Sequence, residues 1–94
     1  MTISAIKSSV AKVAGAYDIK KVSLFGSYAH GTQKSDSDID LLVEFGEPSV
    51  SLFRLAGIKL RLEELTGKSV DVIHSPIPYD SLIEIDKEVV LYER

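Results

Sequence analysis

Residues 25–45 read FGSYAHGTQKSDSDIDLLVEF, and this stretch decides the fold. It joins the end of a buried strand, predicted over residues 21–25, to a second strand predicted over residues 39–45, which is rich in β-favourable residues. The glycine at position 26 ends the first strand, and the polar residues 32–37 form a loop. The stretch therefore predicts two strands that are linked through a Gly-Ser turn and an acidic loop.

Two aspartates stand at the start of the second strand. Side chains at i and i+2 of a strand project from the same face, so we expect Asp38 and Asp40 to present their carboxylates side by side. Like charges this close repel each other, and one pKa is then raised unless a cation neutralises the pair. Mg²⁺ prefers a few carboxylates together with water and phosphate oxygens. The pair predicts a magnesium and nucleotide site, with a solvated turn over residues 35–38 as the plainer alternative.

A third carboxylate comes later in the chain. Asp71 is the charged residue of an otherwise apolar strand predicted over residues 69–73, where a charge without a partner is costly. If this strand lies beside the one that begins at Asp38, three carboxylates share one edge and can hold two metal ions. The spacing leaves this pairing open, and a solvated sheet edge is the alternative.

The Gly-Ser pair is suited to binding phosphate. The missing side chain at Gly26 lets phosphates approach the backbone, while the hydroxyl of Ser27 and the amides of a short helical turn over residues 28–30 can donate hydrogen bonds. The two histidines, His30 and His74, are expected as surface or capping residues rather than as ligands.

Two apolar stripes at helical spacing predict two helices, with Ile6, Val10, Val13 and Tyr17 in the first and Leu55, Ile58, Leu62 and Leu65 in the second. The second helix spans residues 51–66 and ends at Gly67, and its other face, with Arg54, Lys59 and Arg61, is expected to be solvated. A turn over residues 75–78, a short helix over residues 79–86 and a strand over residues 89–92 complete the chain. We therefore expect one α/β domain over residues 1–94, a small mixed β-sheet with helices packed on it.

Composition narrows the class of function. Eleven Lys and Arg against fourteen Asp and Glu give the 94 residues a net charge of -3, which disfavours a mainly electrostatic nucleic-acid binder. The chain has no cysteine, which excludes a disulfide, a cysteine-ligated zinc and a thiol nucleophile. Its first residues are too polar for a signal peptide, and no apolar run reaches the ~20 residues of a membrane span. We therefore expect a cytoplasmic protein without a membrane partner.

These residues resemble the signature of a known family. The minimal nucleotidyltransferases of the DNA polymerase β-like superfamily have the pattern Gly-Ser, ten residues and then Asp-x-Asp. The chain is similar to this pattern at Gly26-Ser27 and at Asp38 and Asp40. Asp71 matches the third Asp that follows later in the family. The resemblance covers nearly the whole chain. It implies the nucleotidyltransferase core fold and the transfer of a nucleoside monophosphate, AMP from ATP, to a hydroxyl with two Mg²⁺ ions. Asp38, Asp40 and Asp71 would then be the catalytic and metal-binding residues, and Gly26 and Ser27 would hold the leaving phosphates.

The resemblance also implies a protein partner. Many family members are antitoxins that silence a HEPN-type ribonuclease toxin, either by adding AMP to a toxin tyrosine or by binding it. The family often has Arg where this chain has His30, which replaces a fixed charge near the triphosphate with a pH-dependent one. The chain ends at Arg94 without the further helical domain of larger relatives, so we expect a site completed by a partner or by a homodimer.

Two alternatives stay open. The chain could be a binding module that keeps the fold and neutralises a toxin by contact, with weak or no catalysis. It could also be an unrelated acidic α/β domain in which the Asp pair belongs to a turn. Intact carboxylates at all three positions favour an enzyme over the binding module.

Overall fold

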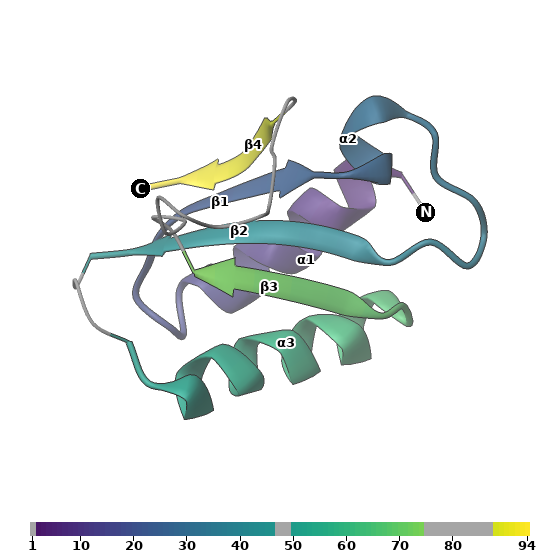
Figure 1. Ribbon diagram of the computed structural model, residues 1–94. Coiled ribbons are helices and arrows are strands. Elements are labelled where there is room, and N and C mark those ends of the chain that lie inside the picture. The colour runs from purple at the N-terminus through teal and green to yellow at the C-terminus, as the bar shows by residue number, and fades with distance from the viewer. Residues whose placement is uncertain (1, 47–49, 75–87) are drawn as a thin grey trace, which may run out of the picture.

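Three helices and four strands make up the part of the chain that the computed structural model describes, residues 2–46, 50–74 and 88–94 (Figure 1). In chain order they are α1 (Ile3–Ala14), β1 (Ile19–Phe25), α2 (Ser27–His30), β2 (Ile39–Phe45), α3 (Leu52–Thr66), β3 (Val70–His74) and β4 (Val89–Glu93). The turn expected over residues 75–78 and the helix expected over residues 79–86 lie outside the described residues. Within the described segments, no helix is long and apolar enough to cross a membrane.

The four strands form one mixed sheet in the order β3-β2-β1-β4. β1 runs antiparallel to both β2 and β4, whereas β2 and β3 are parallel. A parallel pair needs a crossover connection, and α3 lies between β2 and β3 in the chain. The expected small α/β fold with a mixed sheet is confirmed.

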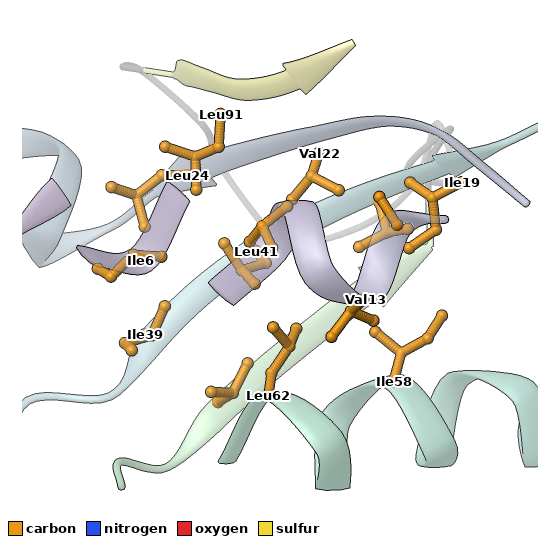
Figure 2. Packing of buried hydrophobic residues seen from close by; sticks show 14 of the residues in the cluster. Ile6, Val13, Ile19, Val22, Leu24, Ile39, Leu41, Ile58, Leu62 and Leu91 are labelled. Carbon is orange, nitrogen blue, oxygen red and sulfur yellow. The ribbon is translucent and has the colours of Figure 1, made fainter. Parts of the chain in front are cut away.

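The hydrophobic core lies between one face of the sheet and the two long helices (Figure 2). Along β2 the side chains alternate strictly, so that Ile39, Leu41, Val43 and Phe45 are buried and the residues between them are half-buried. The helices contribute, among others, Ile6, Val10 and Val13 from α1 and Ile58 and Leu62 from α3. Because side chains alternate across a strand, Asp40 projects from the opposite face of the sheet, away from both helices.

The long helices begin and end at the residues that local chemistry favours. The hydroxyls of Thr2 and Ser51 cap α1 and α3, each accepting a backbone N–H at 3.1 Å three residues later. Gly67 ends α3 in the left-handed region, with φ at 71° and its N–H donating to the Glu63 carbonyl at 2.8 Å. Tyr17, expected on the helical stripe, lies beyond the end of α1, although its ring still packs against the core.

The basic face of α3 is solvated as expected at Lys59 and Arg61, which are exposed, whereas Arg54 is half-buried. The Arg54 guanidinium lies 5.9 Å from the centre of the Phe45 ring, and Arg61 pairs with Glu64 at 2.9 Å. Phe53 and Leu60 form a second, exposed apolar stripe on this helix, and they are 92% and 64% exposed. The periodicity used to choose core residues could not reveal this second stripe, because apolar residues were expected to be buried.

Candidate active site

The parallel pairing of β2 with β3 brings two of the predicted carboxylates together. Asp40 is the register partner of Asp71, so both side chains project from the same open face of the sheet, near the start of each strand. Asp40 is half-buried, and Asp71 is exposed because β3 is an edge strand. The strand pairing that the spacing left open is thus the one that gathers the acidic residues.

The surroundings of Asp40 raise its pKa. Partial burial raises the pKa of Asp40 above its ordinary value of 3.8, and the charges of Asp71 and Asp38 and a side-chain hydrogen bond with Asp71 raise the pKa further. Each cause disfavours the ionised form of Asp40 in the isolated protein. A bound cation would reverse this preference, because it would neutralise the carboxylates that now repel one another.

Asp38 lies one residue before β2 begins at Ile39, as the strand predicted over residues 39–45 implies, and it is exposed. It is near enough to Asp40 for its charge to raise the pKa of that residue. The loop before β2 contains a turn in which the Lys34 N–H donates to the Ser37 hydroxyl at 2.8 Å.

Gly26 brings the end of β1 against the carboxylate of Asp40. Gly26 has φ at 72° and ψ at -150°, a conformation that is essentially restricted to glycine. A Cβ at this position would overlap Oδ2 of Asp40 and lie 3.1 Å from its Cγ. The glycine is therefore required both by the backbone conformation and by the close approach of Asp40.

Replacing Gly26 by alanine is expected to destabilise the fold by at least about 1–3 kcal/mol, because the backbone conformation is strained for any residue with a Cβ. The overlap with Asp40 adds to this cost. Urea unfolding measures the loss. Gly15→Ala is the matched control, since Gly15 has φ at -68° and no atom within 4 Å of its added Cβ. Equal stability of the two variants would contradict the role assigned to Gly26.

The turn after Gly26 forms the short helix α2, as expected. The N–H groups of Ala29 and His30 donate to the Gly26 carbonyl at 3.1 and 3.2 Å, so these two amides are used within the turn. The amides of Ser27 and Tyr28 stand before them at the helix start. Tyr28 is buried and anchors α2 to the core, which holds Ser27 next to the carboxylates.

Two hydrogen bonds beside the site were not foreseen from the sequence. Lys68, just before β3, donates from Nζ to the Ser35 carbonyl at 2.7 Å, and the Ile39 N–H donates to the Ser69 carbonyl at 2.9 Å. These bonds tie the acidic loop and the start of β2 to the residues just before β3. A single lysine after a helix-ending glycine carries no sequence signal for such a contact.

The donor set fits a hard divalent cation such as Mg²⁺. Asp40 and Asp71 offer carboxylate oxygens side by side, and burial together with the charges of Asp71 and Asp38 raises the pKa of Asp40. Among residues 2–46, 50–74 and 88–94, no group of three His, Cys, Asp or Glu side chains lies close enough together to hold a metal by itself. Mg²⁺ commonly takes one or two carboxylates and completes its shell with water and substrate phosphate, which suits a pair of this kind.

Comparison with known proteins shows the family to which this chain belongs. The profile of the nucleotidyltransferase domain matches residues 3–92. The candidate protein adenylyltransferase MJ0435 of Methanocaldococcus jannaschii is 43% identical over 93 residues, which cover 99% of this chain and 95% of that protein. The chain belongs to the nucleotidyltransferase-domain family, and the expected class of enzyme is confirmed.

Solved structures with the same fold include two of toxin–antitoxin complexes. One, a toxin–antitoxin with AMP-PNP, has a TM-score of 0.79 at 21% identity, covering 94% of this chain and 73% of that chain. Another contains a tri-AMPylated Shewanella oneidensis HEPN toxin with its MNT antitoxin, and has a TM-score of 0.73 at 15% identity, covering 99% and 74% of the two chains. At these identities the likeness establishes the fold.

Proposed function

We propose that this protein is an antitoxin that transfers AMP from ATP to a hydroxyl group, a tyrosine, of a partner HEPN-type toxin. The observation that carries the proposal is the pairing of Asp40 with Asp71 beside the Gly26 turn, on a nucleotidyltransferase fold. The relative at 43% identity bears the name of a protein adenylyltransferase, and a protein of the same fold is bound to an AMPylated toxin. These likenesses support a protein acceptor for the transferred AMP.

Each candidate residue has a distinct task in this reaction. Asp38 and Asp40 would bind the metal ions that accompany the triphosphate, and Asp71 would complete the metal site on the acceptor side. Gly26 lets the carboxylate of Asp40 lie against the turn, and Ser27, at the start of α2, would donate hydrogen bonds to the leaving phosphates. Mg²⁺, when bound, would supply positive charge that neutralises the triphosphate and the carboxylates.

The transfer itself is a displacement at phosphorus. The hydroxyl oxygen of the acceptor forms a bond to the α-phosphorus, the bond from that phosphorus to the pyrophosphate oxygen breaks, and pyrophosphate leaves. Asp71 is proposed to help take up the proton of the hydroxyl, because it is exposed at the sheet edge where an acceptor can approach. Positioning and charge neutralisation supply most of the catalysis in reactions of this class.

A second candidate function is neutralisation by binding alone. The exposed apolar stripe on α3 would favour a protein contact, but it gives no reason for Asp40 to be held in an electrostatically unfavourable place. The strained carboxylate arrangement therefore favours the enzyme.

A HEPN-type toxin that this protein neutralises is expected to gain one or more AMP units when both are incubated with ATP and Mg²⁺, as measured by intact-protein mass spectrometry. Omitting the metal by adding excess chelator should abolish the gain, because the carboxylates then lack the cation. An unmodified toxin that is nonetheless inhibited would establish the binding module instead. A mass gain that persists in chelator would contradict the metal-dependent site.

A further inference from the structure

The connection from α3 to β3 is short, and hydrogen bonds fix its path. The Gly67 N–H donates to the Glu63 carbonyl at 2.8 Å, and the Lys68 N–H donates to the Thr66 hydroxyl at 3.3 Å. The Glu63 carboxylate accepts the Val70 N–H at 2.9 Å, where β3 begins. A short connection that is bonded at both ends gives Lys68 a defined place beside the start of β3.

The same connection holds the loop before β2 at two points. Lys68 donates from Nζ to the Ser35 carbonyl at 2.7 Å, and the Ser69 carbonyl accepts the Ile39 N–H at 2.9 Å, where β2 begins. Asp38 lies between these two points in the sequence, directly before Ile39. The segment that contains Asp38 is therefore attached to the start of β3 on both sides.

A turn keeps the shape of the loop between the two attachments. The Ser37 N–H donates to the Lys34 carbonyl at 3.1 Å, and the Lys34 N–H donates to the Ser37 hydroxyl at 2.8 Å. Ser35 lies within this turn, so a restraint on its carbonyl acts on the whole turn. Loss of that restraint would reach Ser37 and then Asp38, which follows it in the chain.

The bond from Lys68 is suited to this task. Lys68 is half-buried, although a lysine is ordinarily among the most exposed residues. Its Nζ is charged, and hydrogen bonds with a charged donor are roughly twice as strong as those between neutral groups. The bond joins a loop to a connection, so its effect falls on the position of the loop rather than on the hydrophobic core.

Asp38 needs such a restraint because of its charge. It is exposed, and its charge raises the pKa of Asp40, so the two carboxylates repel each other while no cation is bound. An unattached loop would move Asp38 away from Asp40, and a metal ion would have to order the loop on binding. A loop that is already in place binds the ion more tightly, because less ordering is required.

We propose that Lys68 is a positioning residue, which holds the loop containing Asp38 against the start of β3 before Mg²⁺ binds. Lys68 acts through the Ser35 carbonyl and does not itself touch the metal ion, the nucleotide or the acceptor. The use of Asp38 as a metal ligand rests on the proposed function.

Amide hydrogen exchange of the metal-free protein, measured by NMR, tests the attachment. Lys68→Met keeps most of the side-chain stem and removes the donor, so we expect it to speed exchange at the Ser37 and Ile39 N–H groups at least about fivefold. Lys68→Arg keeps a charged donor and should restore slow exchange. Lys59→Met is the matched control, because it removes a lysine charge from an exposed position of α3, and it should change neither rate.

Calorimetry with a non-hydrolysable ATP analogue in saturating Mg²⁺ tests the consequence for the site. We expect Lys68→Met to weaken binding roughly tenfold, as is typical when a group that supports a metal ligand is removed. Lys68→Arg should recover most of this loss, and Lys59→Met should bind like the native protein. Melting temperatures of all variants in chelator report any general loss of stability.

The outcomes separate the role of Lys68 from the proposed function. Weaker nucleotide binding with unchanged exchange in Lys68→Met would mean that Lys68 touches the nucleotide itself, and would overturn the inference. A lower melting temperature with native affinity for the nucleotide would make Lys68 merely structural, and would also overturn it. A native protein that binds no nucleotide in Mg²⁺ would instead overturn the proposed function, and with it the use of the attachment in catalysis.

Discussion

Asp40→Asn is expected to abolish AMP transfer and, at the same time, to raise the melting temperature of the metal-free protein. The first effect follows from the loss of a carboxylate proposed to hold the metal ion. The second follows from the strain at this position, because burial and the charges of Asp71 and Asp38 raise the pKa of Asp40. An amide keeps the shape of the side chain and removes the charge that the folded state disfavours.

The gain in melting temperature from Asp40→Asn is expected to depend on pH. The pKa of Asp40 is higher in the folded chain than in the unfolded chain, so protonation of Asp40 stabilises the fold. This stabilisation is fully present when the pH is below the pKa that Asp40 has in the unfolded chain. It is lost as the pH rises through the pKa that Asp40 has in the folded chain. The gain in melting temperature from Asp40→Asn should therefore be largest near neutral pH, and it should shrink below the ordinary pKa of Asp.

Thermal melts in chelator from acidic to neutral pH measure the stability of the two proteins, and mass spectrometry of the toxin measures transfer. Glu44→Gln is a matched control, because Glu44 is a half-exposed acid on the same face of β2 and pairs with Lys20 at 3.9 Å instead of with other carboxylates. It should transfer AMP normally. A large loss of stability in Asp40→Asn, or retained transfer, would show that this carboxylate is structural.

Much of this fold could be predicted from local patterns, and the reason is physical. β2 was predicted over residues 39–45 and spans Ile39–Phe45, because its alternation and the glycine and proline after it are local signals. Gly67 ends α3 at the expected residue for the same reason. At Gly26 the expectation was an approach of phosphates to the backbone, which stays a prediction, whereas the structure shows the carboxylate of Asp40 against this glycine.

The remaining features depend on packing between distant parts of the chain. The pairing of Asp40 with Asp71 is a register between two strands, and nothing local to either strand determines it. The tie between the acidic loop and the start of β3 depends on Lys68, which comes from beyond α3. The outer stripe of α3 was missed because composition does not distinguish a buried apolar side chain from an exposed one.

Asp71→Asn is expected to spare the binding of Mg²⁺-ATP and to slow AMP transfer by roughly 10² to 10⁴. Asp71 is exposed on an edge strand, so removing its charge should cost little stability. In the proposed mechanism it serves the hydroxyl and the second metal rather than the triphosphate. Removing it should therefore act on the rate and leave the affinity for nucleotide close to that of the native protein.

The two quantities are measured separately, the affinity by calorimetry with Mg²⁺ and a non-hydrolysable ATP analogue, and the rate by mass spectrometry of the toxin at saturating Mg²⁺-ATP. Asp36→Asn, at an exposed acid in the loop before β2, controls for the loss of one surface charge and should change neither. If Asp71→Asn binds nucleotide normally and also transfers AMP at the native rate, Asp71 is a solvated residue of the sheet edge. The site then consists of Asp38 and Asp40 alone, and deprotonation of the acceptor has to come from a group outside β3.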